Sequence, residues 1–376
     1  MRVLFYNEGN LGEQIMGQGQ LDAALHTGLG DSGSVTARYA GLTPMGRVAQ
    51  AAAHRPLPLL SHAKIGFEMP RWHTVQSLRA RSALRRELRE WPADIVQVHS
   101  HSVSFALGAT MAELPVVLSV DTTVRDWRQM PAWRPPPRRG AIELAVSEAL
   151  ERRAFNRAAL VLAWTGWARD SVARTAPAAH VVEHHPGLDL ERYKPLPRSP
   201  RERPRVLFIG GRFQAKGGED LLAVLGEDLG VGVDLHIVTP ADVPQRSGVT
   251  VHRLGPSDPE LLRLLQDCDV LCLPTHGDAA PWVVLEAMAC GTPVLASHIG
   301  GIPDLLDGGR AGVLVPHAER QALGESLRAL LADPQRRGEL AAHGRARCES
   351  HYDARVQGRR LIELLQDVAR GRGATS

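Results

Sequence analysis

The sequence predicts an α/β protein built from two doubly wound domains that face each other across a cleft. Short apolar runs alternate with helical patterns along the whole chain. The alternation restarts near residue 205, after a segment rich in Pro and Arg. A length of 376 residues is too great for one core and suits two domains.

The apolar runs predict the strands, and the helical patterns between them predict the helices. Strands joined by helices of this length form right-handed βαβ units. The expected strands of the first half are Arg2–Tyr6, Ile95–His99, Val116–Val120 and Leu160–Trp164. Those of the second half are Arg205–Ile209, Asp234–Val238, Val270–Pro274, Val294–Ser297 and Gly312–Val315. The expected helices include Gln76–Trp91, Ile142–Arg157, Pro259–Gln266, Arg320–Leu331 and Ala354–Arg370.

The segment KPLPRSPRERPR, Lys194 to Arg205, has the composition of a linker. We therefore expect a first domain at 1–193 and a second at 194–353. The remainder, 354–376, is expected to form a C-terminal helix that can cross back to the first domain, with a frayed polar tail. Ligands of parallel sheets bind beyond the carboxyl ends of the strands, so the cleft is the expected site.

Composition narrows the class of protein. A net charge of +3 gives no reason to expect a nucleic-acid partner. The start MRVLFY reads as a strand rather than a signal peptide, and no apolar run approaches a membrane span, so we expect a cytoplasmic protein. No C-x-x-C pair or zinc spacing occurs, which predicts reduced core thiols and no metal site. The cysteines are Cys268, Cys272, Cys290 and Cys348.

The stretch VLFIGGRFQAKGGEDLL is the first candidate site. Gly210 and Gly211 end a strand and let a ligand approach the backbone, while Arg212 and Lys216 place two cations beside it. The spacing fits neither a P-loop nor G-x-G-x-x-G, which weakens the ATPase and dinucleotide readings. A surface loop with solvated cations explains these residues equally well at this point.

The second candidate is PTHGDAAPWVVLEAMACGTPV, where Pro281 suits the first position of a helix. The amides of Trp282, Val283 and Val284 would then point out of the helix start and attract an anion. Asp278 and Glu286 stand on either side and could hold hydroxyl groups, which outlines a nucleotide sugar. The alternative is a helix cap and a solvated charge. The apolar surroundings of Glu286 demand a partner, which favours a ligand.

At this point the residues resemble a known family. DAAPWVVLEAMACGTPVLASHIGGIPDLLDGGRAGVLV is similar to the retaining glycosyltransferases of family 4 (group 1), which have the GT-B fold. Their signature is a Glu, seven residues and a second Glu, followed by EAMACG-P-V and GG-PE. FIGGRFQAKGGEDLL resembles their diphosphate loop, and HHPGLDLERYKP the segment that closes their first domain. The likeness is close over 186–350 and loose in the first domain.

The resemblance implies roles for these residues. Arg212 and Lys216 would hold the donor diphosphate, Glu286 would bind the ribose, and Asp278 would contact the transferred sugar. The backbone amides near Pro281–Val283 would complete the contacts to the phosphate and the sugar of the donor. The family needs no metal or other cofactor, and its leaving phosphate is thought to deprotonate the acceptor. Two departures stand out: Asp278 replaces the usual Glu, and Asp121 stands where the family often has His. Asp121 could contact the sugar, stabilise positive charge on it, or cap the turn after it; a site role is favoured.

The first domain offers weaker candidates. In the family a glycine-rich turn follows the first strand, and we choose Gly12 and Gly17 for that role. His99 ends a strand and could face the cleft, although a structural role is favoured. RDWRQMPAWRPPPRRG, Arg125 to Gly140, is expected to be a long loop, with Trp127 on the acceptor side.

The helix Gln76–Trp91 has a basic side that could meet a membrane or an anionic acceptor, but a solvated face is favoured. Its basic residues are Arg79, Arg81, Arg85, Arg86 and Arg89.

Together these features predict a retaining glycosyltransferase that moves a sugar from a UDP- or GDP-linked donor to the hydroxyl of a small-molecule, glycan or lipid-linked acceptor. Peripheral membrane contact is not favoured. The alternatives are a nucleotide-sugar epimerase or hydrolase, a donor-binding pseudoenzyme and, more remotely, an NAD-dependent oxidoreductase.

Overall fold

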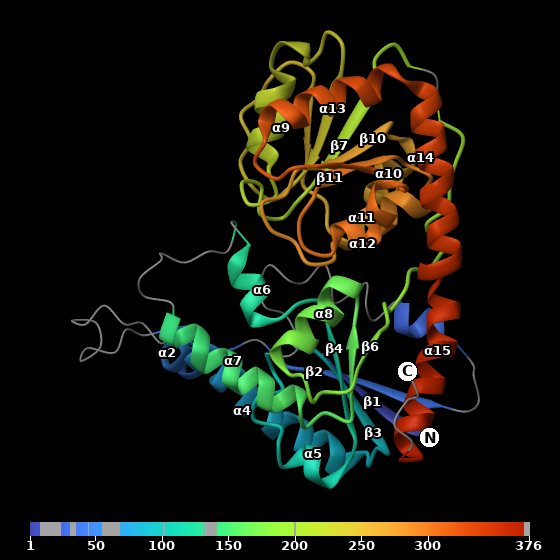
Figure 1. The fold of residues 1–376 in the computed structure, drawn as a ribbon. Coiled ribbons are helices and arrows are strands. Elements are labelled where there is room, and N and C mark those ends of the chain that lie inside the picture. The colour runs from blue at the N-terminus through green and yellow to red at the C-terminus, as the bar shows by residue number, and fades with distance from the viewer. Residues whose placement is uncertain are drawn as a thin grey trace, which may run out of the picture.

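The structure, a computed structural model, contains two parallel six-stranded sheets with helices around them (Figure 1). It describes residues 1–7, 24–30, 35–43, 45–54, 68–100, 102–130, 132, 141–198 and 201–371. One sheet belongs to each half of the chain, and the two halves lie one above the other in Figure 1. The predicted fold class is confirmed.

The first sheet has the order β2-β1-β3-β4-β5-β6. Its strands are β1 (Arg2–Asn7), β2 (Thr36–Gly41), β3 (Ile95–His99), β4 (Val116–Val120), β5 (Leu160–Ala163) and β6 (Val181–Glu183). Its helices are α2 (Arg47–His54), α4 (Glu68–Glu90), α5 (Thr110–Glu113), α6 (Val124–Gln129), α7 (Ala141–Phe155) and α8 (Gly166–Thr175). The sequence did not predict β2 and β6, because these edge strands are only partly buried and lack a continuous apolar run.

The second sheet has the order β12-β11-β10-β7-β8-β9. Its strands are β7 (Arg205–Ile209), β8 (Asp234–Val238), β9 (Val249–His252), β10 (Val270–Leu273), β11 (Val294–Ser297) and β12 (Val313–Val315). Its helices are α9 (Gly218–Leu225), α10 (Pro259–Asp267), α11 (Trp282–Ala289), α12 (Ile302–Leu305), α13 (Arg320–Ala332) and α14 (Pro334–Arg347). The strand order reverses between β7 and β10, which opens a crevice at their carboxyl ends.

The chain returns to the first sheet at its end. After α14 a wider helical turn over Cys348–Tyr352 leads into α15 (Ala354–Ala369), which runs down beside the first sheet (Figure 1). The close contact depends on glycine, because a Cβ on Gly358 would lie 2.0 Å from the carbonyl oxygen of Gly28. Helix α15 therefore belongs with the first domain in space.

The Pro- and Arg-rich segment predicted as a linker is tied to the second domain. Arg198 donates to the carbonyl of Gly291 at 2.7 Å and to Oγ1 of Thr292 at 3.0 Å, and Arg201 pairs with Asp267 at 2.5 Å. These contacts fix the point at which the chain enters β7.

One predicted loop is wrong in part. Residues 124–129 form α6, capped by the side chain of Thr123, and residue 131 and residues 133–140 of the predicted loop lie outside the described residues. Thr123 caps α6, whereas the carboxylate of Asp121 interacts with its own backbone amide and with that of Thr122, so the local capping role considered for Asp121 stands beside its site role.

Within the described part of the chain, no helix is long and apolar enough to cross a membrane. As predicted, all four cysteines are buried and unpaired.

Candidate active site

The loop after β7 is packed too tightly to carry side chains at two positions. A Cβ on Gly210 would lie 2.9 Å from the Cβ of Lys216. Gly217 has a left-handed φ of +79°, and a Cβ there would lie 1.9 Å from the carbonyl oxygen of Pro274, at the end of β10. The two glycines thus bring Lys216 to the crevice between β7 and β10.

Lys216 and Asp278 form a direct ion pair between Nζ and Oδ2. Their side chains are only 20% and 15% exposed, so the pair is largely shielded from water. The loop of Asp278 rests on two glycines, since Gly301 donates to the carbonyl of Ala279 at 2.7 Å and a Cβ on Gly300 would lie 2.0 Å from the carbonyl oxygen of Asp278. Two residues predicted to act on opposite parts of a donor are therefore bonded to each other.

Asp121 joins this pair from the other domain. It follows β4 and is half-buried. The pKa of Asp121 is raised to about 6, chiefly by burial and also by the charge of Asp278, while its own backbone amide, Lys216 and the amide of Thr122 oppose the rise. Asp121, Lys216 and Asp278 form a group of interacting charges across the cleft, which we call the charged cluster.

Helix α11 begins one residue later than predicted. Pro281 is the N-cap residue and Trp282 the first helical residue, because Pro281 has an extended ψ of 118°. Among the described residues, no group accepts a hydrogen bond from the backbone amides of Trp282 or Val283. These two amides can bind an anion. The prediction of a free amide at Val284 is wrong, because that amide donates to the carbonyl of Pro281 at 3.1 Å.

Glu286 is buried, but its partner is a residue that the sequence analysis did not select. Its side chain lies in the second turn of α11, the residue is 3% exposed, and Oε1 accepts a 2.9 Å hydrogen bond from the hydroxyl of Tyr193. The expectation that this buried carboxylate needs a partner is confirmed, but the partner is a protein hydroxyl, so burial alone gives no support for a ligand at Glu286. The pKa of Tyr193 is raised by burial and by Glu286, which keeps the phenol protonated.

His99 and Trp282 meet in an aromatic group between the domains. Trp164, at the end of β5, stacks on His99 with centroids 5.0 Å apart and meets Trp282 edge-on at 5.6 Å. Its indole nitrogen donates to Ser119 Oγ at 2.8 Å. His99 therefore lies at the domain interface, and its ring contacts another side chain there.

His185 completes the aromatic group, 5.2 Å from Trp282. Burial lowers the pKa of His185 to about 3, so the ring is neutral. Nδ1 accepts from the amide of Gly187 at 3.0 Å, which leaves the proton on Nε2. Neither Nε2 of His185 nor Nε1 of Trp282 has an acceptor among the described residues.

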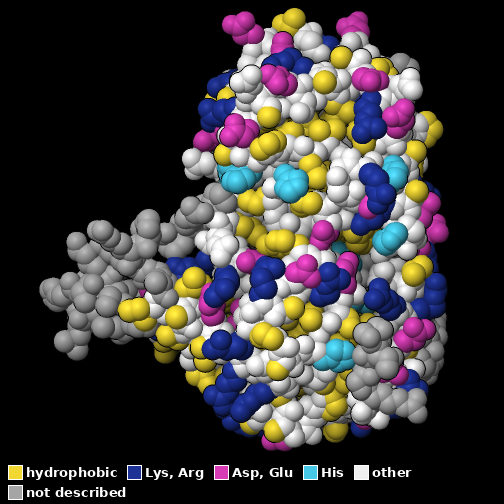
Figure 2. Space-filling view, in the orientation of Figure 1, with side chains coloured by type: hydrophobic (Ala, Val, Ile, Leu, Met, Phe, Trp, Pro, Cys, Tyr) yellow, Lys and Arg dark blue, Asp and Glu magenta, His cyan; other side chains and the backbone are white. Residues whose placement is uncertain are grey.

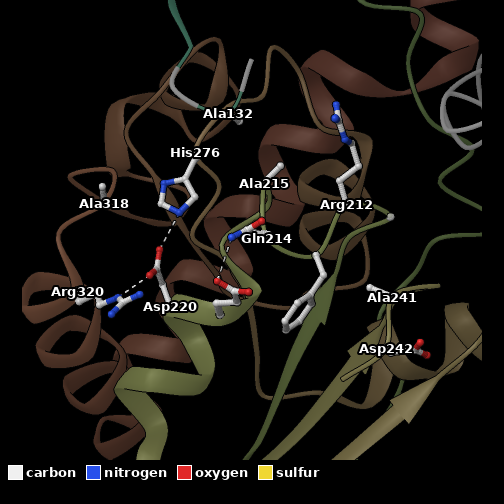
Figure 3. Close-up of a pocket in the computed structure, with 13 residues that line it drawn as sticks. Ala132, Arg212, Gln214, Ala215, Asp220, Ala241, Asp242, His276, Ala318 and Arg320 are labelled. Atoms are coloured by element: carbon white, nitrogen blue, oxygen red, sulfur yellow. Dashed lines mark hydrogen bonds and ion pairs between the residues drawn. The ribbon is translucent and has the colours of Figure 1, made fainter. Parts of the chain in front are cut away.

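A pocket of about 940 Å³ lies at the cleft edge of the second domain (Figure 3). Its lining includes Gly211 and Arg212 and, from the first domain, Ala132, whose amide donates to the carbonyl of His276 at 3.1 Å.

The remaining predicted residues that the structure describes are not part of this pocket. Trp127 is half-buried on α6, while Gly12 and Gly17 lie outside the described residues.

Three polar residues of this pocket were missed by the sequence analysis. In Figure 3 Asp220 lies between His276 and Arg320. His276 Nε2 is 2.8 Å from one Asp220 oxygen, and Arg320 Nε is 2.5 Å from the other. No sequence spacing connects these residues; the signal available was an acidic residue in the first turn of α9 facing a cleft. The described residues contain no group of three or more His, Cys, Asp or Glu that could hold a metal ion.

Comparison with known proteins identifies the family. The model described as glycosyl transferases group 1 matches residues 203–333, and the model described as glycosyltransferase family 4 matches residues 42–192. The chain belongs to the group 1, family 4 glycosyltransferases. The family predicted from the sequence is confirmed, and so is the prediction of an enzyme of the glycosyl-transfer class.

Curated relatives of this glycosyltransferase carry names of the same class. It is 29% identical to the alpha-maltose-1-phosphate synthase of Mycolicibacterium smegmatis, over 72% of this chain and 79% of that protein. It is also 29% identical to the D-inositol 3-phosphate glycosyltransferase of Saccharomonospora viridis, over 49% of this chain and 48% of that protein. The match thus spans about half the length of the second relative.

Solved structures share the fold. The sucrose-phosphate synthase of Thermosynechococcus elongatus superposes with a TM-score of 0.75 at 19% identity, covering 99% of this chain and 100% of that one. The Anabaena protein HepE in complex with UDP-glucose superposes with a TM-score of 0.69 at 17% identity, covering 98% and 100%. At such identities the likeness is one of fold, and it confirms the two-domain GT-B architecture.

Proposed function

We propose that this glycosyltransferase moves a sugar from a UDP- or GDP-linked donor to an acceptor hydroxyl, with retention at the anomeric carbon and without a bound metal. The observation that carries the proposal is the charged cluster, in which Lys216 pairs with Asp278 beside Asp121. The amides at the start of α11 follow Asp278 on the same loop. Positive groups and a sugar-facing carboxylate thus occur together at the crevice.

The chemistry assigned to these groups is electrostatic. The bond between the anomeric carbon and the diphosphate oxygen breaks while the acceptor oxygen bonds to that carbon. The acceptor proton passes to the departing diphosphate. Lys216, Arg212 and the amides of Trp282 and Val283 would stabilise the charge that develops on the diphosphate. Lys216 would exchange its bond to Asp278 for one to phosphate, which frees Asp278 for the sugar.

The names of the relatives guide the choice of substrates. HepE was solved with UDP-glucose, so UDP-sugars are tested first. The names of the two curated relatives and of the sucrose-phosphate synthase each refer to a phosphorylated compound. Phosphorylated sugars and polyols are therefore the acceptors to test first. The test is incubation with UDP-glucose or GDP-mannose and an acceptor panel in the presence of EDTA. NMR of the product then gives its anomeric configuration. An α-linked product made in EDTA supports the proposal, and a strict metal requirement or a β-linked product contradicts it.

Base-assisted transfer with inversion is the competing function, and Asp121 favours it. A carboxylate whose pKa is about 6, at the position where the family often has His, could accept a proton from the acceptor. The product configuration separates the two, because a base at Asp121 predicts the inverted anomer.

A further inference from the structure

A second pocket lies in the first domain, away from the cleft. It has a volume of about 250 Å³ and is formed by α4, α7 and the turn before α5. Figure 1 places α5 at the end of the first domain that faces away from the second domain. The lining contains three arginines: Arg81 on α4, Arg153 near the end of α7 and Arg157 just beyond it. Three cations thus converge from two helices on one small space.

These arginines have no anionic partner in the described part of the chain. None of the three guanidinium groups takes part in a hydrogen bond or ion pair there, and the buried Nε of Arg81 has no acceptor. Carboxylates on the same two helices are used elsewhere, since Glu87 of α4 pairs with Arg38 at 2.8 Å and Glu148 of α7 pairs with Arg125 at 2.8 Å. Like charges brought together repel, so the arrangement is stabilised when an anion enters.

The wall of the pocket is hydrogen-bonded to α4 and leaves space for one of the arginines. The turn over residues 103–106 is fastened to α4 by Ser77, which is fully buried, donates to the carbonyl of Val103 at 3.0 Å and accepts from the amide of Ala106. A Cβ on Gly108 would lie 2.5 Å from Nη1 of Arg157, so the glycine leaves the space that the guanidinium occupies. The cations therefore stand against an ordered surface.

We propose that this pocket is a second binding site, which takes a phosphate ester between Arg81, Arg153 and Arg157. Guanidinium groups hold phosphate oxygens in pairs of hydrogen bonds, and two or three of them match the charge of a phosphate dianion. The concave shape suits a small soluble ester better than a flat membrane. Figure 2 shows Lys and Arg side chains gathered on the part of the surface where Figure 1 places α4 and α7, which would draw an anion toward it. The site is independent of the donor and acceptor sites at the cleft.

The test is calorimetric titration of the full chain with glycerol 3-phosphate and, separately, with inorganic phosphate, at constant ionic strength. The pocket variant is Arg153→Gln with Arg157→Gln. Its matched control is Arg89→Gln with Arg152→Gln, which removes the same charge from two exposed arginines of the same helices that do not line the pocket. A third variant, Lys216→Met, separates this site from the charged cluster.

Loss of two charge-assisted contacts predicts an affinity about tenfold or more lower in the pocket variant. The control and Lys216→Met should bind as the native protein does. Gly108→Ala keeps every charge and should weaken binding by displacing Arg157. An equal loss of affinity in the pocket variant and in the control would mean that the anion is attracted without a specific site and would overturn the proposal. Absence of binding by the native protein would also overturn it.

Binding to phosphatidylcholine vesicles with and without phosphatidylglycerol is the last comparison. If the pocket variant binds anionic vesicles more weakly than the native protein does but binds the soluble esters equally well, the lipid headgroup is the ligand and the soluble ester is excluded.

Discussion

The hydroxyl of Tyr193 donates a 2.9 Å hydrogen bond to Oε1 of Glu286, across 93 positions of the chain. Tyr193 lies on the segment that leaves the first domain, and Glu286 lies on α11 of the second. Both residues are buried, so the bond is shielded from water and orients the carboxylate. We expect Tyr193 to be a positioning residue for the group to which the family resemblance assigns the donor ribose.

Tyr193→Phe should therefore affect both stability and donor binding. Removing a donor from a buried carboxylate costs about 1.5–3 kcal/mol of unfolding free energy, measured by urea denaturation. If Glu286 binds the ribose, KM for the donor rises while kcat changes little. The double variant with Glu286→Gln should lose less than the sum of the two single variants. An unchanged KM would show that Glu286 does not meet the donor.

Asp121 should make the stability depend on pH in an unusual direction. Its pKa is about 6 in the folded protein, above the ordinary value of 3.8 for an aspartate, so between these values the folded state holds more protons than the unfolded state. Ionised Asp121 therefore lowers the free energy of unfolding. This loss of stability begins as the pH rises through the window and is complete above pH 6.

Asp121→Asn removes that cost. Thermal unfolding should show the variant more stable than the native protein at pH 7–8, by up to about 3 kcal/mol, and equal to it below pH 4. A difference that is constant from pH 4 to pH 8 would contradict the raised pKa.

Lys216 should be needed for chemistry more than for folding. Lys216→Met removes one cation from the proposed diphosphate site, and kcat should fall by about 100-fold or more. Lys194→Met is the matched control, because Lys194 is exposed and lies outside the cluster. A variant that keeps near-native kcat would remove Lys216 from the mechanism.

Asp278→Glu restores the residue that is usual in the family. The added methylene lengthens the reach toward the sugar, so the ratio of kcat/KM between two donor sugars should change. If the ratio is unaltered, the shorter carboxylate does not set donor choice.

Gly217→Ala tests the scaffold of the site. The left-handed φ of +79° and the 1.9 Å approach to Pro274 predict a loss of about 3 kcal/mol or more in unfolding free energy. Gly211→Ala is the control, because a Cβ on Gly211 has no neighbour within 4 Å. Similar stability of both variants would show that the loop adjusts freely.

Strands buried on both faces could be predicted from the sequence to the residue, as at Ile95–His99 and Val116–Val120. Edge strands such as Thr36–Gly41 could not, because half-burial removes the apolar run that marks a strand. The sequence indicated the loops of Lys216 and Asp278 through local motifs, and the structure brings these two residues together.

Contacts between the domains were not predictable. The amide of Trp167 at the start of α8 donates to Asp304 at 2.6 Å, across 137 positions, and the amide of Ala132 donates to the carbonyl of His276 at 3.1 Å. Such pairs follow from how two domains pack, which no local pattern contains. Within the first domain, Arg81 was predicted to lie on a solvated helix face, and Arg153 and Arg157 were not selected, because no local pattern shows that α4 and α7 bring these arginines together.

The central claim is that the crevice beside Lys216 and Asp278 binds a nucleotide sugar. Calorimetric titration of the native protein and of Lys216→Met with UDP and GDP, then with UDP-glucose and GDP-mannose, tests it most directly. The account predicts that at least one nucleotide binds the native protein with micromolar affinity and binds Lys216→Met about tenfold or more weakly. No binding by any of these ligands, or equal affinity in both proteins, would contradict it.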